Sequence, residues 1–493
     1  MSVAPLKILF VGAELEPLVK VGGLADVMGS LPRALAKQGL DIKIIIPFYA
    51  NIDRKKFHFR LKQKNISLDL DSDTTTFDLY QSRLPNSNIV IWLIKHRLFD
   101  YPDIYLGQRK YLQGRSYTRS TNDIERFTFF SKAVAELIRQ SAWKPDVVHC
   151  HDWHTALVPT FIDEYSLEYN SFPNISTLFT IHNLANQGVA GLDLINYANL
   201  HHDWTPALME DYYDRDGDVV DLIKIGILSA DQVSTVSPTY AREILSKQFG
   251  ESLEKYLQRR RHDLSGILNG LDWKFFDPAH DKFIKKNYSR ASLDRGKAVN
   301  KLFLQKKIGL SGRASVPLFS LVSRLVKQKG LDILLPALKN ILAKNDLQIV
   351  ILGNGEPLYE KQLKKLAQEF SQKLKVIVSF DAVLAQQIYA GSDFFLMPSQ
   401  FEPCGLGQMI AQRYGSIPVA RQTGGLKDTI SNNQTGLLFR PYQSQALLFA
   451  LSRAVKLYQN KNKFYAMRKR IMKIDHSWSA SAKEYIKIYK KLS

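Results

Sequence analysis

The sequence is poor in cysteine and has no long apolar segment. Cys150 and Cys404 are its only cysteines in 493 residues, and two cysteines cannot supply the disulfide framework of a small secreted domain. No uninterrupted apolar stretch reaches the length of about 20 residues that a membrane-spanning helix needs. The first residues form only a short apolar run with acidic residues directly behind it, unlike a secretory signal peptide. We therefore expect a soluble protein of the cytoplasm, where thiols stay reduced.

Acidic residues are fewer than basic ones. The chain has 47 Asp and Glu residues against 67 Lys and Arg residues, which gives a formal net charge of +20. An excess of this kind occurs in proteins that bind polyanions. Here the basic clusters at 258–262, 282–286 and 467–473 are scattered, and they have acidic neighbours or helical spacing. We therefore expect no nucleic-acid or membrane partner, and we favour attraction of small anions as the benefit of the charge.

The length and the hydrophobic pattern predict two large domains. A chain of 493 residues, 45% of them hydrophobic, is too long for one hydrophobic core. Short apolar runs alternate with amphipathic segments in the first third of the chain, and the same rhythm begins again at Val316. This alternation is typical of parallel sheets built from strand–helix–strand units. We expect an α/β protein with two doubly wound, Rossmann-like domains at 1–255 and 256–470. A C-terminal helix at 471–493 is expected to pack back on the first domain.

A Gly-Gly-Leu-x-Asp turn occurs once in each expected domain, in "KVGGLADV" at 20–27 and in "QTGGLKDT" at 422–429. Each turn follows an expected strand and precedes a helix, and ligands of open α/β sheets bind beyond the carboxyl ends of strands. Paired glycines let the backbone approach a ligand with bare N–H groups, and a helix N-terminus favours anions. Lys20 adds a mobile cation, while Asp26 suits either the helix end or a sugar hydroxyl. The alternative is a tight turn that needs no ligand. We expect the two domains to face each other across a cleft, with both turns directed into it.

Two further stretches place charged residues in loops after expected strands. "SRLVKQKG" holds Arg324 and Lys329, two cations that suit a diphosphate, although a solvated charge run gives the same pattern. "FEPCGLGQ" holds Glu402 in a loop before a helix that starts near Gly405. A carboxylate in this position is often only a helix cap. The glycines beside Glu402 nevertheless allow the backbone to come close to whatever this carboxylate faces.

A cluster of metal-ligand residue types occurs in "HCHDWH", which holds His149, His151, Asp152 and His154. His149 alternates with strand neighbours, and no further Cys or His residue follows at a ligand spacing. We therefore expect no metal at this cluster.

Eight motifs in one order give a specific resemblance. The chain resembles the bacterial glycogen synthases and plant starch synthases from about Leu6 to Tyr489. The resemblance implies a GT-B glycosyltransferase that moves glucose from ADP-glucose to the 4-hydroxyl at the non-reducing end of an α-1,4-glucan. It also implies retention of configuration by front-side attack, with the leaving phosphate as base and no metal or other cofactor. The motifs are KVGGLADV, PDVVHCHDWHTAL, FTIHNLANQG, VSPTYAREI, LSGILNGLDWKFFDP, SRLVKQKGLDIL, PSQFEPCGLGQM and TGGLKDT.

The resemblance also implies roles for single residues. Glu402 would hold hydroxyls of the donor glucose and stabilise an oxocarbenium-like state, and His182 would lie at the same sugar. Arg324 and Lys329 would stabilise the leaving phosphate, as cations must where no metal is present. The residues implied in substrate binding are Lys20, Gly22, Gly23, Asp26, Asp152, His154, Asn183, Asn269, Phe380, Cys404, Gly405, Leu406, Thr423, Gly424 and Gly425.

The sequence departs from the family pattern at two positions. Many GT-B transferases carry a second Glu eight residues after the first, and this chain has Ile410 there. Bacterial glycogen synthases also tend to lack it, so Glu402 is expected to act alone. Phe380 stands where the family often has Tyr next to the adenine pocket. Stacking on the base survives this change, and a hydroxyl hydrogen bond does not.

Three alternative functions stay open at this point. The first is a related retaining transferase that uses UDP-glucose or another acceptor. The second is a glucan-binding protein on an inactive scaffold, which is disfavoured because Lys20, His182, Arg324, Lys329 and Glu402 are all present. The third is a polyanion-binding protein, which only the net charge suggests.

Overall fold

The computed structural model describes residues 4–71, 73–101, 103–106, 123–169, 175–191, 193–200 and 219–493. The chain divides into two compact units. Unit 1 comprises 1–236, 241–270 and 478–493, and unit 2 comprises 237–240 and 271–477. Each unit is an α/β body with one large sheet. Among the described residues, no helix is both long and apolar enough to cross a membrane.

The sheet of unit 1 has the strand order β11-β10-β7-β6-β1-β2-β5-β4-β3. All neighbours from β11 to β5 are parallel. The apolar runs of the central strands are buried, as expected for strands that are covered on both faces. The strands are β1 (Lys7–Val11), β2 (Asp41–Pro47), β3 (Arg60–Leu70), β4 (Asp73–Arg83), β5 (Val90–Lys95), β6 (Val147–His151), β7 (Ser176–Ile181), β10 (Gln232–Thr235) and β11 (Leu264–Gly266).

Strands β3 and β4 extend this sheet in the antiparallel direction. The sequence pattern predicted parallel sheets and assigned no strand to this segment. The C-terminal half of β3 alternates buried and exposed residues from Ile66 to Leu70, which is typical of a sheet with one face in water. A second, small sheet pairs β8 (Val189–Gly191) with β9 (Val219–Asp221).

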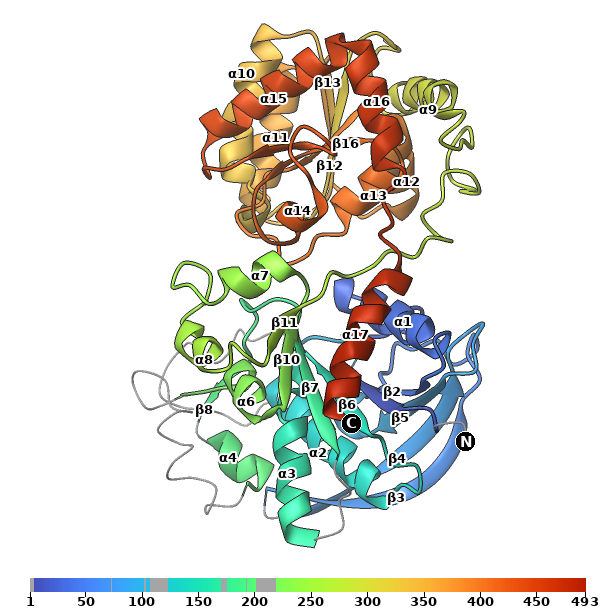
Figure 1. Cartoon of the computed structure of the whole chain (residues 1–493), viewed down its shortest axis with the longest axis vertical. Coiled ribbons are helices and arrows are strands. Elements are labelled where there is room, and N and C mark those ends of the chain that lie inside the picture. The colour runs from blue at the N-terminus through green and yellow to red at the C-terminus, as the bar shows by residue number, and fades with distance from the viewer. Residues whose placement is uncertain are drawn as a thin grey trace. The chain divides into compact units, whose positions relative to one another are not determined.

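The final helix, α17 (Trp478–Leu492), packs against α1 (Gly23–Ala36) in unit 1, and Figure 1 shows the two helices beside each other. Trp478, Tyr485 and Tyr489 of this helix are buried. Tyr489 also forms a hydrogen bond with the Nδ1 atom of His149, at 2.8 Å. The other helices among the described residues of unit 1 are η1 (Arg97–Phe99), α2 (Asp123–Gln140), η2 (Trp153–Thr155), α3 (Val158–Tyr169), α4 (Asp193–Ala198), α6 (Leu222–Ser229) and α8 (Glu254–Arg259), and α7 (Pro238–Glu243) is shared with unit 2.

The sheet of unit 2 is parallel throughout, in the order β14-β13-β12-β15-β16-β17. Helices α10 and α15 pack together over the main apolar core, and α9 packs with α12. The strands are β12 (Leu318–Val322), β13 (Gln348–Leu352), β14 (Leu374–Ile377), β15 (Phe394–Met397), β16 (Ile417–Arg421) and β17 (Leu437–Phe439). The helices are α9 (Leu293–Lys307), η4 (Lys327–Lys329), α10 (Leu331–Lys344), α11 (Pro357–Glu369), α12 (Ala382–Gly391), α13 (Gly407–Arg413), α14 (Gly424–Thr429), α15 (Ser444–Gln459) and α16 (Lys461–Ile471).

The division between the units differs from the predicted one. The sequence pattern placed boundaries after residues 255 and 470, whereas the units divide after Gly270 and Ser477. The short strand β11 pairs with β10 and so belongs to unit 1. One residue beyond the boundary, the Leu271 N–H donates to the carbonyl of His476 within unit 2. A strand of this length in a charged segment leaves no periodic signal in the sequence.

Each sheet has a position where the chain reverses its direction of strand addition. In unit 1 this position lies between β1 and β6, and in unit 2 it lies between β12 and β15. The loops at the carboxyl ends of two such strands diverge to opposite faces of the sheet and leave a crevice between them. The most promising ligand sites therefore lie after β1 and β6 in unit 1 and after β12 and β15 in unit 2.

Candidate active site

The predicted site residues of unit 1 follow the carboxyl ends of parallel strands of one sheet. The loop after β1 carries Lys20 and Gly22, while Gly23 is the first residue of α1 and Asp26 lies in the first turn of this helix. Asp152 and His154 follow β6, His182 and Asn183 follow β7, and Asn269 follows β11. The strand order places β7, β6 and β1 next to one another. The sheet therefore brings these loops to a single edge.

The loop before α1 is held by a buried carboxylate that the sequence reasoning missed. Glu14 is 3% exposed, and its Oε2 atom accepts the N–H groups of Val21 at 2.6 Å and Gly22 at 2.8 Å. Its Oε1 atom accepts the hydroxyl of Tyr105 at 2.6 Å. The expectation that Gly22 presents a bare N–H group is thus wrong, because this N–H already has a partner. Glu14 lies three residues after β1, so the strand-end rule offered a signal for it.

Gly23, at the start of α1, and Lys20, in the loop before this helix, have different surroundings. A Cβ atom added at Gly23 would meet nothing within 4 Å, so packing within unit 1 does not require glycine there. Lys20 pairs with Asp26, with 2.5 Å between Nζ and Oδ1, and both side chains are substantially exposed. An exposed pair of this kind is weak and exchanges readily for another anion.

The loops after β6 and β7 are joined by hydrogen bonds. The His182 N–H donates to Oδ1 of Asp152 at 2.7 Å, and the Nε2 atom of His182 lies 3.0 Å from Nδ1 of His151. Burial lowers the pKa of His182 to about 3 and lowers that of His151 well below its usual range. Both rings are therefore neutral near pH 7, and one donates a hydrogen bond to the other.

Asp152 is expected to give the stability of unit 1 a pH dependence. Burial raises the pKa of its carboxyl to about 7, although the backbone N–H groups of His182 and Asn183 favour the carboxylate. In the unfolded chain an Asp carboxyl ionises near about pH 4, so the folded state holds the proton more tightly. The resulting stabilisation is complete below about pH 4 and is lost as the pH rises to about 7.

We therefore expect Asp152→Asn to flatten the pH dependence of the free energy of unfolding between about pH 4 and pH 7. Asn tolerates the φ of 57° at this position. Urea denaturation of wild type and variant across this pH range measures the difference in slope, with the exposed Asp53→Asn as control. Equal slopes in the wild type and Asp152→Asn would contradict the prediction.

The remaining members of "HCHDWH" have structural partners. The Nε2 atom of His149 lies 2.6 Å from the hydroxyl of Thr180, and the ring of His154 packs on Trp153 and Tyr105. Burial lowers the pKa of His154 to about 3. Among the described residues, no group of three or more His, Cys, Asp or Glu side chains is arranged to hold a metal ion.

Unit 2 contains a pocket of about 210 Å³ in which Lys329 and Glu402 meet. The Nζ atom of Lys329 lies 2.7 Å and 3.0 Å from the two carboxylate oxygens of Glu402. Ser399 donates its hydroxyl to Oε2 of Glu402 at 2.9 Å, a contact that the sequence reasoning missed although Ser399 lies in the same motif. The side chains of Lys329 and Glu402 are 18% and 8% exposed. The pocket lies at the switch point of the sheet, between the loops after β12 and β15.

Close packing of the backbone fixes this pair. Gly330, directly after Lys329, has a φ of 77°, and a Cβ atom there would lie 2.1 Å from the carbonyl oxygen of Pro398. Only glycine allows this approach. It brings the loop that carries Lys329 against the loop that carries Glu402.

The second Gly-Gly turn supports Glu402 from the other side. A Cβ atom at Gly424 would lie 2.0 Å from the carbonyl oxygen of Glu402, and one at Gly425 would lie 2.1 Å from that of Cys404. The Gly425 N–H donates to the carbonyls of Glu402 at 3.0 Å and Pro403 at 3.2 Å. This N–H is therefore not bare, contrary to expectation. The turn needs glycines first of all because it packs on the segment of Glu402.

Only some of the other predicted residues of unit 2 line this pocket. Gly405 and Leu406 line the pocket with Ile410, so an apolar side chain occupies the position of the second Glu found in many relatives of the GT-B class. Glu402 is the one carboxylate among the lining residues of this fully described unit. Arg324 is exposed, Cys404 is buried, and Thr423 precedes α14; none of the three lines the pocket. Phe380, after β14, is 88% exposed, which leaves its ring face available.

Comparisons with known proteins match nearly the whole chain. Residues 7–259 match the family described as starch synthase catalytic domain, and residues 311–470 match the family described as glycosyl transferases group 1. A glycogen synthase from Geotalea daltonii is 41% identical over 98% of each chain. Glycogen synthases from Gloeobacter violaceus and Thermotoga maritima are each 39% identical over 99% of each chain.

Two solved structures are also similar. The catalytic domain of starch synthase IV from Arabidopsis thaliana, bound to ADP and acarbose, is 33% identical, with a TM-score of 0.87 over 99% of each chain. Sucrose-phosphate synthase from Thermosynechococcus elongatus is 18% identical, with a TM-score of 0.59 over 99% of each chain. The second likeness is one of fold alone.

Proposed function

The chain belongs to the glycogen and starch synthase family, and we propose that it transfers glucose from ADP-glucose to the 4-hydroxyl at the non-reducing end of an α-1,4-glucan. Its two Rossmann-like units are those of a GT-B glycosyltransferase, and its relatives make it a hexosyltransferase. The observation that carries the proposal is the pocket of unit 2, where Lys329 and Glu402 meet at the switch point of a parallel sheet.

The chemistry of the transfer requires stabilisation of a leaving diphosphate. The bond between C1 of glucose and the diphosphate oxygen breaks, the acceptor oxygen bonds to C1 on the same face, and its proton passes to the leaving phosphate. Negative charge develops on the diphosphate as the bond breaks, and a prearranged cation stabilises that charge in the transition state. We assign this role to Lys329, with Arg324 as a second cation in the same loop.

Glu402 is assigned to the donor sugar. A carboxylate accepts hydrogen bonds from sugar hydroxyls, and its charge stabilises the positive charge that develops at C1. In the structure this carboxylate is occupied by Lys329 and Ser399. We propose that, when the donor binds, Lys329 leaves Glu402 and pairs with the diphosphate instead. The exchange would free one carboxylate oxygen for a glucose hydroxyl while Ser399 keeps the other in place.

The proposal includes a neutral His182 and no metal cofactor. A neutral imidazole forms a hydrogen bond with a glucose hydroxyl without placing a second positive charge near C1, and the low pKa of His182 supports this assignment. Lys329 and Arg324 supply the positive charge that a divalent metal supplies in other transferases. We also propose a cytoplasmic location, in keeping with two buried cysteine thiols that are not joined in a disulfide.

The test is transfer of labelled glucose into a glycogen primer from ADP-glucose and UDP-glucose in parallel, with and without EDTA. We expect incorporation mainly from ADP-glucose and equal rates with EDTA. Faster incorporation from UDP-glucose would mean that UDP-glucose is the donor. Full loss of incorporation with EDTA would overturn the metal-free mechanism. Absence of incorporation from either donor, with ADP or glucan still bound, would instead favour another acceptor or a non-catalytic glucan binder.

A further inference from the structure

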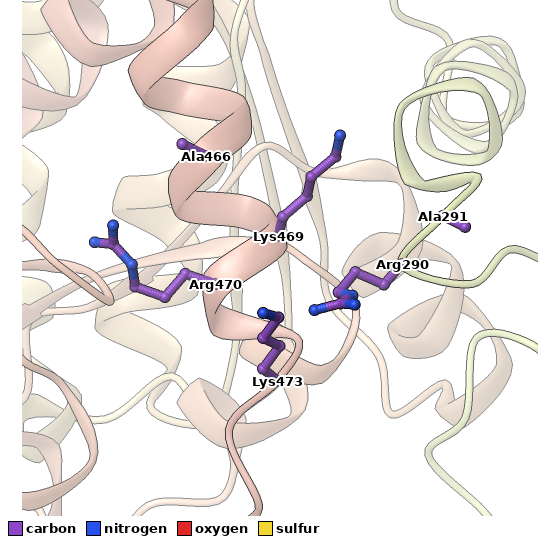
Figure 2. Close-up of a pocket in the computed structure, with 6 residues that line it drawn as sticks. All are labelled: Arg290, Ala291, Ala466, Lys469, Arg470 and Lys473. Atoms are coloured by element: carbon purple, nitrogen blue, oxygen red, sulfur yellow. The ribbon is translucent and has the colours of Figure 1, made fainter.

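A basic hollow of about 460 Å³ lies on the surface of unit 2, between α16 and the segment before α9. Its lining consists of Arg290, Ala291, Ala466, Lys469, Arg470 and Lys473, all of them exposed. Figure 2 shows the guanidinium of Arg290 extending toward α16, while Arg470 extends away from Arg290. None of these residues has a part in the proposed transfer reaction.

Helix α16 and the turn after it build one wall of the hollow. Residues 466, 469 and 470 lie on one face of α16, and Lys473 follows in the turn directly after the helix ends at Ile471. On the opposite side of the helix, Phe464, Met467 and Ile471 are buried in the core of unit 2, so the basic face is held toward solvent. Helix α16 contains no acidic residue.

The cations of the hollow have no acidic partner. The ion pairs of unit 2, which is described without gaps, involve other residues. Arg470 donates only to the carbonyl of Gln434, at 3.2 Å. Cations at the end of a helix are favoured by its dipole, which accounts for Lys469 and Arg470. The dipole does not account for Arg290, because this residue comes from a different segment.

We propose that this hollow binds a small anion that carries two or more phosphate groups. Arg290, Lys469 and Lys473 bring three positive charges to the lining of one hollow, and a multivalent anion relieves their mutual repulsion. The guanidinium of Arg290 matches a phosphate group with two hydrogen bonds. The two alanines leave room between the cations, and the volume lies within the range of about 300–1,000 Å³ that is typical of ligand sites.

The composition of the hollow favours a small anion over a nucleic acid. Single-stranded nucleic acids bind where aromatic side chains stack on bases along a basic groove. No aromatic residue lines this hollow, so it offers no surface on which bases could stack. The site therefore provides contacts for phosphate groups and none for bases.

The experiment measures binding of inorganic pyrophosphate to the full chain by equilibrium dialysis at physiological ionic strength. It compares wild type with two double variants, Arg290→Gln with Lys473→Gln, and Lys361→Gln with Lys364→Gln. The second pair removes the same charge from exposed positions of α11, and it controls for net charge. The diphosphate site proposed at Lys329 is unchanged in all three proteins, so its binding is a common background.

We expect wild type and the α11 variant to bind one more pyrophosphate than the Arg290 and Lys473 variant, whose affinity at this site falls by at least about tenfold. Equal binding by all three proteins, or equal loss in both variants, would overturn the proposal. A further outcome is that a single-stranded oligonucleotide displaces the pyrophosphate when its total phosphate concentration is below that of the pyrophosphate. That result would overturn the proposal in favour of a nucleic-acid site. The assay does not use glucose transfer, so its outcome is independent of the proposed enzyme activity.

Discussion

Glu402→Gln is expected to lower the rate of glucose transfer by at least about 10²–10³-fold, the range found when one stabilising group of a transition state is removed. The variant keeps the volume and one acceptor oxygen of the side chain but loses its charge. The charge is the part of Glu402 that responds to positive charge developing at C1. Initial rates with saturating ADP-glucose and glycogen primer measure the effect.

The same variant tests whether the loss is chemical or structural. Removing one partner of a fully buried ion pair costs about 3–5 kcal/mol of unfolding free energy. We expect a smaller loss here, because the side chain of Lys329 is 18% exposed and keeps access to water. Thermal unfolding of the variant checks this, and Glu369→Gln on the surface helix α11 is the matched control. A near-normal transfer rate in Glu402→Gln would remove Glu402 from its assigned role.

Lys329→Gln is expected to lower kcat/KM for ADP-glucose by about 10²–10³-fold, because the leaving diphosphate loses its nearest cation. Lys327→Gln is the matched control. Lys327 is exposed in the same short helix, and the same substitution there should leave kcat/KM nearly unchanged. An equal loss in both variants would mean that Lys329 contributes only to the local charge.

The double variant Lys329→Gln with Glu402→Gln distinguishes two interpretations of this ion pair. If Lys329 exchanges Glu402 for the donor diphosphate, the two residues act in one reaction step. Their effects should then be strongly non-additive, so that the double variant is little slower than the slower single variant. If the ion pair were only structural, the double variant would be more stable than either single variant. Its rate would then be reduced by the product of the two single reductions. Steady-state kinetics of all four proteins distinguish these results.

The architecture could largely be predicted from the sequence. The apolar runs that form β1, β12, β13 and β15 are short and almost entirely buried, and short apolar runs of this kind in the sequence predict buried strands. Because Lys329 and Glu402 both follow such strands, their position at the carboxyl edge of a parallel sheet could be predicted as well. The half-exposed antiparallel pair β3–β4 and the three-residue strand β11 could not be predicted. The first departs from the alternation of strand and helix, and the second is too short to show a period.

The sequence by itself determined which residues stand at the ends of strands, because backbone conformation and burial leave a local pattern. Only the tertiary structure decided what those residues touch. Lys329 meets Glu402 across 73 positions of sequence because β12 lies beside β15, and the second Gly-Gly turn reaches Glu402 because β16 lies beside β15. In the corresponding turn of unit 1, the Gly22 N–H donates to Glu14 instead. The same five-residue pattern therefore has two different partners, since strand order and loop packing, and not the local sequence, select the groups that surround it.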